Sequence, residues 1–239
     1  MMKIKNVLTN FLGIANVLLT FIFYLVKNRS FSQLGEDLVI KNQLQWAGYS
    51  SKEKGAYVDI GCYHPLDGSN TYIFYRKGSS GIVVDIGKSK KLLFNIFRRR
   101  DKFINSAVVP DSMANDSFKF VTTGYGSKTD QVEVSEGYDP DHSVNVIGIS
   151  ALLESGKRYL FKSWSILSID AEGMDQSIVE SINFDDYPFT IVAFENFFDD
   201  PCEKIKSAIG NSTHVYLTSY GYILQSICGP TYIYIKYKR

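Results

Sequence analysis

Short runs of apolar residues alternate along this chain with segments that are apolar on one side only. Four of these runs are apolar almost throughout, as in strands buried on both faces of a sheet, and each contains an acid near its end. They span residues 56–62, 81–87, 164–170 and 190–196. Segments 32–47, 88–100 and 175–182 instead repeat their apolar residues at helical spacing. Strands that alternate with helices predict an α/β fold with a mostly parallel sheet.

The same pattern predicts further elements in the first half of the chain. Ser32 is expected to cap helix 32–47, a helix is expected to start within 67–72, and residues 103–109 predict another strand. The apolar residues of helix 88–100 are expected to face the sheet. These are Leu92, Leu93, Ile96 and Phe97.

The second half of the chain is less regular. Segment 110–143 is rich in loop residues, with strands expected near 118–122 and 132–134, and a helix is expected at 201–209. Two aromatic-rich runs, 214–218 and 231–237, are separated by glycine turns. Because no convincing helix separates them, they predict an antiparallel hairpin at one edge of the sheet.

Length, charge and cysteine content narrow the class of protein. The 239 residues fit one medium domain, residues 30–239, preceded by a hydrophobic extension, residues 1–29. A formal net charge of +1 gives no strong field, so no nucleic-acid partner is expected. The three cysteines are far apart, which argues against a disulfide framework and favours a reducing, cytoplasmic compartment for the domain.

The extension has the length and composition of a membrane-associated helix. Residues 6–26 contain no charged side chain, and about 20 apolar residues suffice to cross a bilayer. We therefore expect membrane association through residues 7–26, as a single N-terminal helix. A helix docked on the domain's own surface is the alternative.

The first two apolar runs have the features of a mononucleotide-binding half. The first ends in Asp59-Ile60-Gly61, where the glycine lets a ligand approach the backbone, and the second ends in Asp85, which can accept hydrogen bonds from both hydroxyls of a ribose. The three-glycine fingerprint of dinucleotide-binding proteins is missing. This pattern favours S-adenosylmethionine over NAD.

Acidic and amide residues recur at the ends of the predicted buried strands. In an open parallel sheet, ligands bind at the carboxyl ends of the strands, near the point where the strand order reverses. Any single acid there can be a helix cap or a solvated strand end, but an unpaired buried carboxylate is costly, and the whole set predicts a site. The set comprises Asp59, Gly61, Asp85, Asp170, Glu172, Glu195 and Asn196.

Four pieces of the chain resemble the FkbM family of S-adenosylmethionine-dependent methyltransferases. In order, they lie at residues 32–37, 57–61, 69–71 and 169–173. The resemblance implies a Rossmann-like class I methyltransferase fold with a seven-stranded sheet, and O-methylation, often of sugars in glycans, glycolipids or glycosylated metabolites. Family members commonly have Glu-Pro after the second strand, where this chain has Asp85-Ile86-Gly87.

The resemblance also implies roles for the residues of its motifs. Asp59 and the Gly61 turn would hold the amino-acid portion of the cofactor, and Asp85 would hold the ribose. The full set of expected cofactor-binding residues is Gln33, Glu36, Asp37, Asp59, Gly61, Asn70, Asp85 and Asp170.

A sugar hydroxyl is weakly acidic, so a base or a metal ion is expected to help remove its proton. The candidate catalytic residues are Asp170, Glu172 and His64, with His142 as a second candidate histidine. Asp170, Glu195 and Asn196 together form an oxygen-rich set that would suit Mg²⁺. The alternative is that Asp170 and Glu172 orient cofactor or acceptor through hydrogen bonds.

The leading hypothesis is thus an O-methyltransferase for a small-molecule or glycan acceptor. An NAD-dependent nucleotide-sugar enzyme is the alternative among enzymes, although the missing glycine fingerprint counts against it. A non-catalytic S-adenosylmethionine-binding module is the alternative outside enzymes. Residues 121–145 are expected to shape the acceptor pocket.

Overall fold

The computed structural model describes residues 29–88, 90–115, 118–122, 130–134, 145–196 and 208–237, and the side chains of all of these except 118–122 and 130–134. Four sequence-based expectations therefore lie wholly or mostly outside the described residues: the helix at 7–26, His142, the acceptor-pocket segment at 121–145, and most of the helix at 201–209. Within the described ranges, no helix is both long and apolar enough to span a bilayer.

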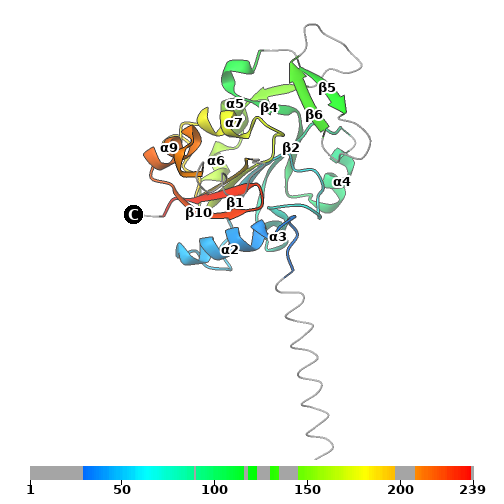
Figure 1. Ribbon diagram of the computed structural model, residues 1–239. Helices are drawn as coiled ribbons and strands as arrows, with labels where there is room; N and C mark the ends of the chain where they lie inside the picture. The colour runs from blue at the N-terminus through cyan, green and yellow to red at the C-terminus, as the bar shows by residue number, and fades with distance from the viewer. Residues whose placement is uncertain are drawn as a thin grey trace, which may run out of the picture. The chain divides into compact units, whose positions relative to one another are not determined.

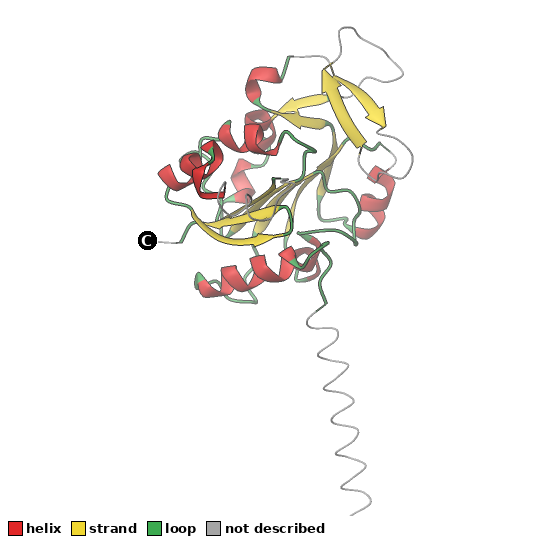
Figure 2. Cartoon of the chain, in the orientation of Figure 1, coloured by secondary structure: helices red, strands yellow, loops and turns green. Residues whose placement is uncertain are grey.

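A seven-stranded sheet forms the centre of the domain, in the order β10-β11-β9-β8-β1-β2-β3 (Figures 1 and 2). Its strands are β1 (Ala56–Ile60), β2 (Ser80–Asp85), β3 (Lys102–Asn105), β8 (Ser165–Ile169), β9 (Ile191–Glu195), β10 (Ile223–Cys228) and β11 (Thr231–Ile235). Strands β3, β2, β1, β8 and β9 pair in parallel, while β11 is antiparallel to both β9 and β10. The predicted Rossmann-like α/β fold, mostly parallel with an antiparallel edge pair, is confirmed.

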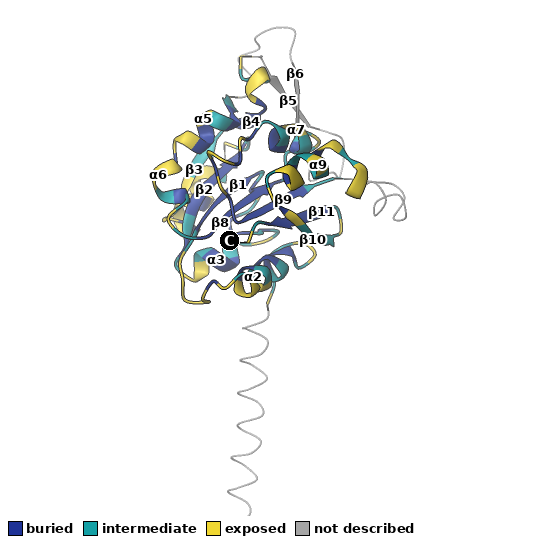
Figure 3. Ribbon diagram, turned by 90° about the vertical axis from the view of Figure 1, so that its left-hand side faces the viewer, coloured by how far each residue is buried: buried dark blue, intermediate teal, exposed yellow. Residues whose placement is uncertain are grey.

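Helices cover both faces of this sheet, so each central strand is buried on both sides. The helices are α2 (Glu36–Trp46), α3 (Tyr72–Arg76), α4 (Lys90–Phe97), α5 (Ile149–Glu154), α6 (Lys157–Leu160), α7 (Asp175–Glu180) and α9 (Ser212–Ser219), with a 3₁₀ turn at Asp111–Met113. Alternate residues of β1 enter different cores: Val58 packs with α5, α6, α7 and α9, and Tyr57 with α2, α3 and α4. Figure 3 shows the strands buried between these layers.

Helix α2 begins four residues later than the sequence pattern predicts. It starts at Glu36 and follows Gly35, whose φ of +89° is left-handed. Ser32 is therefore not the N-cap residue. Its hydroxyl nevertheless accepts a hydrogen bond from the backbone N–H of Asp37 in the first turn of α2 (3.2 Å) and donates one to Asp37 Oδ1 (3.0 Å).

The predicted strand 103–109 is two strands in two sheets. After β3 the chain leaves the main sheet, and β4 (Ala107–Val109) pairs in parallel with β7 (Val146–Gly148). The Asn105 side chain stabilises this break by donating to the carbonyl oxygens of Asp85 (2.9 Å) and Ile86 (2.8 Å). A second small sheet pairs β5 (Phe118–Thr122) with β6 (Asp130–Val134) in antiparallel orientation.

The prediction of a strand at 214–218 is wrong, because these residues belong to helix α9. Asn211 caps the helix by accepting a hydrogen bond from the His214 backbone N–H (2.6 Å). Thr213 and Leu217, spaced four apart, are buried. β-branched and aromatic residues favour strands only weakly, so the cap and the burial of this face prevail. The edge partner of β11 is Ile223–Cys228 instead.

The prediction that the apolar face of helix 88–100 packs on the sheet is also wrong. Phe94 is the buried apolar residue of α4, and Arg98, one turn later, is completely buried. The four residues expected in the core are exposed instead: Leu92, Leu93, Ile96 and Phe97. The periodicity correctly identified a helix, but the helix turns its apolar arc away from the sheet.

Candidate functional site

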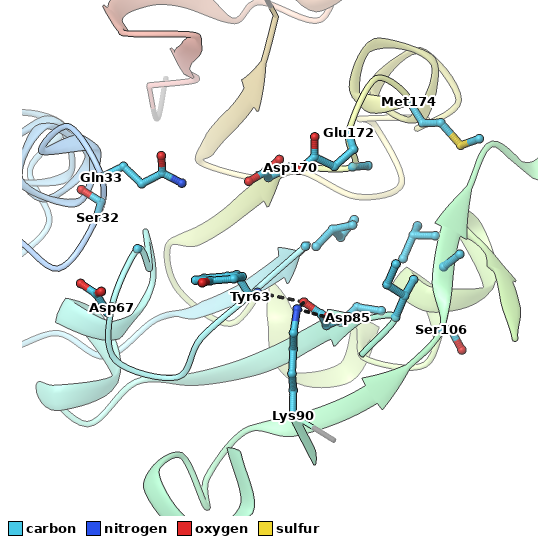
Figure 4. Close-up of a pocket in the computed structure, with 18 residues that line it drawn as sticks. Ser32, Gln33, Tyr63, Asp67, Asp85, Lys90, Ser106, Asp170, Glu172 and Met174 are labelled. Atoms are coloured by element: carbon cyan, nitrogen blue, oxygen red, sulfur yellow. Dashed lines mark hydrogen bonds and ion pairs between the residues drawn. The ribbon is translucent and has the colours of Figure 1, made fainter. Parts of the chain in front are cut away.

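A cavity of about 500 Å³ opens at the carboxyl ends of β1, β2 and β8 (Figure 4). Its size lies within the range of small-molecule and cofactor sites. The residues that line it come from the loop before α2, the ends of β1, β2 and β8 with the loops that follow them, the turn after β3, the start of β4 and the first residue of α4. They are Ser32, Gln33, Ile60, Gly61, Tyr63, Asp67, Gly68, Val84, Asp85, Ile86, Lys90, Ser106, Ala107, Val108, Asp170, Ala171, Glu172 and Met174.

Gly61 allows β1 to turn tightly between its two neighbouring strands. Its φ is +76°, and a Cβ atom at this position would lie 1.9 Å from the carbonyl oxygen of Asp170. Its backbone N–H donates to Val84 O on β2 (2.9 Å). Only glycine fits both the left-handed backbone and the close approach to the end of β8. The predicted glycine turn thus forms the floor of the cavity.

Asp85, the predicted ribose acid, lies at the end of β2 and is 6% exposed. Its carboxylate accepts hydrogen bonds from the backbone N–H groups of Tyr63 (3.0 Å) and Gly87 (2.7 Å). Lys90 Nζ, from the first residue of α4, lies 2.9 Å from both carboxylate oxygens. Figure 4 shows Lys90 approaching Asp85 beside the ring of Tyr63. The two backbone hydrogen bonds therefore fix the position of the carboxylate, while its third partner is the long, flexible side chain of Lys90.

Asp170 and Glu172 line the cavity across from Asp85 (Figure 4). Burial, together with the nearby negative charges of Glu195, Asp175 and Glu172, raises the pKa of Asp170 to about 8. Glu172 has a φ of +49°, which is strained for a residue with a Cβ atom. The end of β8 therefore holds a carboxyl group that is mostly protonated at neutral pH, beside a conformationally constrained loop.

Asp175 holds this loop in place, although sequence reasoning assigned it only to a helix start. The side chain is 3% exposed, and it accepts hydrogen bonds from the backbone N–H groups of Ala171, Gly173 and Glu195 at 3.2–3.3 Å. It thereby ties the loop after β8 to the end of β9. Burial raises the pKa of Asp175, and the backbone hydrogen bonds lower it.

Glu36 and Asp37 do not line the cavity but shape the loop that does. Glu36 Oε2 accepts a hydrogen bond from the Leu34 N–H (2.9 Å), and Asp37 Oδ2 accepts one from the Phe31 N–H (2.8 Å). Both side chains are buried. Ser32 and Gln33, held between these contacts, reach the cavity. Of the predicted residues in this motif, only Gln33 can touch a ligand there directly.

Asp59 is also buried away from the cavity lining. Its Oδ2 accepts a short hydrogen bond from Thr71 Oγ1 and lies 4.0 Å from Arg98 Nη1. Burial raises the pKa of Asp59 to about 6, although Arg98 and Thr71 act in the opposite direction. Asn70, which precedes Thr71 in the loop before α3, donates to Ser168 Oγ on β8 (3.1 Å). Both residues thus fix the loop before α3 rather than line the cavity.

His64 is placed as a turn residue. Its Nδ1 accepts hydrogen bonds from the backbone N–H groups of Leu66 (3.3 Å) and Asp67 (3.1 Å). A ring nitrogen that accepts two N–H groups has no free lone pair for a substrate proton. His64 is not among the lining residues, so the geometry favours Asp170 and Glu172 over it as proton acceptors.

The predicted magnesium set finds no support in the described part of the chain. Glu195 and Asn196 end β9 and do not line the cavity. The buried side-chain atom of Asn196 that lacks a partner is its amide Nδ2, which is a donor and not a metal ligand. No group of three or more His, Cys, Asp or Glu residues that could hold a metal ion occurs among the described residues.

Several lining residues were missed from the sequence: Tyr63, Asp67, Ser106 and Lys90. Ser106 lies directly after β3, so extending the strand-end rule to that strand would have found it. Tyr63, with a φ of +43°, and Lys90 carried no recognisable signal. Their placement depends on how the turn after β1 folds back over Asp85.

Comparison of the sequence with protein-family models and with curated proteins finds no match. Among solved structures, one described as "delta-N METTL16 MTase domain" is similar over 88% of this chain and 86% of that chain, with 10% sequence identity and a TM-score of 0.40. A likeness this distant carries no functional argument. We therefore derive the function from the geometry and charge of the site.

Proposed function

We propose that this protein is an S-adenosylmethionine-dependent O-methyltransferase, related to the FkbM family, that acts on a hydroxyl group of a sugar. The observation that carries the proposal is the charge of the cavity. Four carboxyl groups line it, those of Asp67, Asp85, Asp170 and Glu172. Among the described residues, Lys90 is the one cationic side chain in the lining, and it is paired with Asp85.

This charge distinguishes between the two candidate cofactors. S-adenosylmethionine carries a sulfonium and an ammonium group, which carboxylates attract. NAD carries a pyrophosphate, which normally binds at a glycine-rich loop and a helix N-terminus, away from acids. A cavity lined by acidic groups, of which Asp170 is mostly neutral at pH 7 and can ionise when a cation binds, therefore favours the sulfonium cofactor and disfavours the nucleotide-sugar alternative.

The residues fit the cofactor in three regions of the cavity. Asp85 is placed to accept the ribose hydroxyls once Lys90 yields one carboxylate oxygen. Ile86 and the β4 residues Ala107 and Val108 offer an apolar wall with the Ser106 side chain beside it, which suits the adenine ring. The Gly61 turn and the loop that carries Gln33 would bind the amino-acid portion of the cofactor.

When bound, S-adenosylmethionine supplies an electrophilic methyl group. Asp170 and Glu172 face the same cavity from the end of β8. Glu172 can accept the proton that the acceptor hydroxyl loses as its oxygen attacks, and Asp170 can do so only in its ionised form. The strained loop held by Asp175 keeps these carboxyl groups in place. Much of the rate enhancement in such a transfer can come from alignment, which contributes up to roughly 7–11 kcal/mol.

Calorimetry with S-adenosylmethionine and with NADH tests the cofactor assignment. We expect binding of S-adenosylmethionine and a loss of about 10-fold to 100-fold in affinity for Asp85→Asn, because a charged acceptor of ribose hydroxyls becomes neutral. Asp185→Asn is the matched control, since Asp185 is exposed and outside the cavity lining. Preference for NADH, or unchanged affinity in Asp85→Asn, would refute the assignment.

Methyl transfer from labelled S-adenosylmethionine to a panel of sugars and glycolipids tests the reaction. Incorporation of label into a sugar hydroxyl is the expected result. A chain that binds the cofactor and labels no acceptor would instead be the non-catalytic binding module.

We further propose that the domain works in the cytoplasm and is attached to a membrane through residues 7–26. The uncharged stretch at residues 6–26 supports attachment, and the scattered cysteines support the compartment. If the full chain fractionates wholly with soluble protein, attachment through this segment is wrong.

A further inference from the structure

Helix α4 exposes an apolar surface that nothing in the described part of the molecule covers. The exposed fractions are 66% for Leu92, 39% for Leu93, 49% for Ile96 and 48% for Phe97. These positions fall on one arc of the helix, adjacent to the buried Phe94. Contiguous exposed apolar surface of this kind marks an interaction site more often than scattered single residues do.

Basic residues flank this surface in the sequence. The exposed cations at the two ends of α4 are Lys88, Lys91, Arg99, Arg100 and Lys102. Within residues 88–102 the only acid is Asp101, whose Oδ2 lies 2.6 Å from Nε of the buried Arg98. Because the whole chain has a net charge of only +1, this segment concentrates the positive charge of the protein.

We propose that the exposed face of α4 docks into the interface of an anionic lipid bilayer. Leucine, isoleucine and phenylalanine would enter the boundary between headgroups and acyl chains, while the flanking lysines and arginines would contact lipid phosphates. This site is distinct from residues 7–26 and does not depend on the proposed methyltransferase activity.

The charge pattern favours a bilayer over two other partners. A second copy docked on the same face would bring two clusters of cations together, which is unfavourable. A nucleic acid would match the cations but would leave four aliphatic or aromatic side chains at the centre without a favourable contact. An anionic bilayer satisfies both the apolar arc and the cations.

The docked helix also contributes to the cavity. Lys90, the first residue of α4, contacts Asp85 inside it. Docking of α4 would therefore place the cavity at the level of the lipid headgroups, where the polar part of a membrane-bound acceptor lies.

Site-specific fluorescence in the full chain tests the docking. An environment-sensitive fluorophore is attached to Ile96→Cys, or to Val215→Cys on α9 as the control, because Val215 is an apolar residue that is 60% exposed on another helix. Both carry Cys202→Ser and Cys228→Ser, while Cys62 is buried. The probes are vesicles of phosphatidylcholine with or without phosphatidylglycerol.

We expect a blue shift and an intensity increase of about twofold or more at position 96 with anionic vesicles, and little change at position 215. Equal responses at the two positions, or none at position 96, would overturn the proposal. A response at position 96 that follows protein concentration without vesicles would show docking to a second copy, and would also overturn it.

A charge variant separates specific docking from general adhesion. In Lys91→Gln/Arg99→Gln the vesicle concentration needed for half of the signal at position 96 should rise about tenfold or more, since each cation near an anionic surface contributes to binding. Lys52→Gln/Lys162→Gln removes two exposed lysines elsewhere and should leave this half-signal vesicle concentration unchanged. Equal effects of the two double variants would contradict a specific role for α4.

Discussion

At the scale of single residues, acids near the site divide into those that face the cavity and those that support it. Asp85, Asp170 and Glu172 line the cavity. Asp59 and Asp175 are buried beside it and hold loops by accepting hydrogen bonds. The two groups are alike in sequence, because each acid follows an apolar run or starts a helix. What distinguishes them is where the fold places the carboxyl group, since Asp85 also accepts backbone hydrogen bonds and still lines the cavity.

Asp170→Asn should stabilise the protein in alkaline solution. The pKa of Asp170 is raised from about 4 to about 8, so stability is fully present below pH 4 and is lost as the pH rises from about 4 through 8, because the unfolded chain ionises this group while the folded chain keeps it protonated. The neutral variant avoids this cost. Near pH 9 we expect a gain on the order of 1–3 kcal/mol in the free energy of unfolding, vanishing toward pH 4. Urea denaturation at both pH values measures it, and a gain of equal size at both would contradict the assigned cause.

Arg98 and Arg99 should differ sharply in their effect on stability. Arg98 is completely buried, bonds to Asp101, Ser69 and Thr71, and lies 4.0 Å from Asp59. Arg98→Met leaves buried carboxylates without their cation, and should cost about 3–5 kcal/mol. The adjacent Arg99 is exposed, so Arg99→Met should stay within about 0.5 kcal/mol of the original chain. Similar losses in the two variants, measured by chemical denaturation, would argue against a buried ionic network.

At the scale of elements, the turns at the strand ends fix the geometry of the site. The turn after β1 packs between Val84 and Asp170, and the loop after β8 is held by Asp175. Helix α4 shows the opposite behaviour, because it is attached mainly through Phe94 and Arg98 and leaves its apolar arc exposed. Positions in tight turns therefore tolerate little change, while the outer face of α4 is free for another partner.

Gly61→Ala should disrupt both folding and cofactor binding. The new Cβ atom would overlap the carbonyl oxygen of Asp170, which is backbone and cannot move independently. Gly221→Ala is the control, because its φ of +83° carries the same backbone strain while no atom lies within 4 Å. We expect the control to lose about 1–2 kcal/mol and Gly61→Ala to lose clearly more. Thermal unfolding that ranks the two variants equally would rule out the close contact as the cause.

At the scale of the whole molecule, a sheet with a hydrophobic core on each face supports a cavity at the carboxyl ends of its strands. Residues of β1 alternate between the two cores, so its carboxyl end cannot shift without disturbing both. A ligand in this cavity would contact the ends of three strands, β1, β2 and β8, at once. Its binding free energy should therefore stabilise the domain as a unit and not only the local loops.

S-adenosylmethionine should raise the unfolding temperature of the chain. A ligand present at 100 times its dissociation constant, and bound only to the folded state, adds about 2.7 kcal/mol to the free energy of unfolding. Differential scanning fluorimetry with increasing ligand concentration measures this effect, with NADH as the comparison. A shift that is the same in Asp85→Asn as in the original chain would place the ligand outside the cavity.

The sequence alone determined the elements that depend on local pattern. Buried strands, the glycine turn and the acids at strand ends all have signals within a few residues, since a strand buried on both faces must be apolar and a tight turn needs a left-handed backbone. From these the α/β fold and the position of Gly61, Asp85 and Asp170 could be predicted. Helix α9 was missed because strand propensity is weak against a cap and a buried face.

Tertiary structure alone decided which side chains meet. Lys90 contacts Asp85, Arg98 approaches Asp59, and the apolar arc of α4 faces outward, although periodicity allowed it to face the sheet. In each case the fold either brings together segments that are distant in the chain or determines which face of a helix is buried. Their energies come from burial and electrostatic pairing in three dimensions, which the order of residues along the chain does not specify locally.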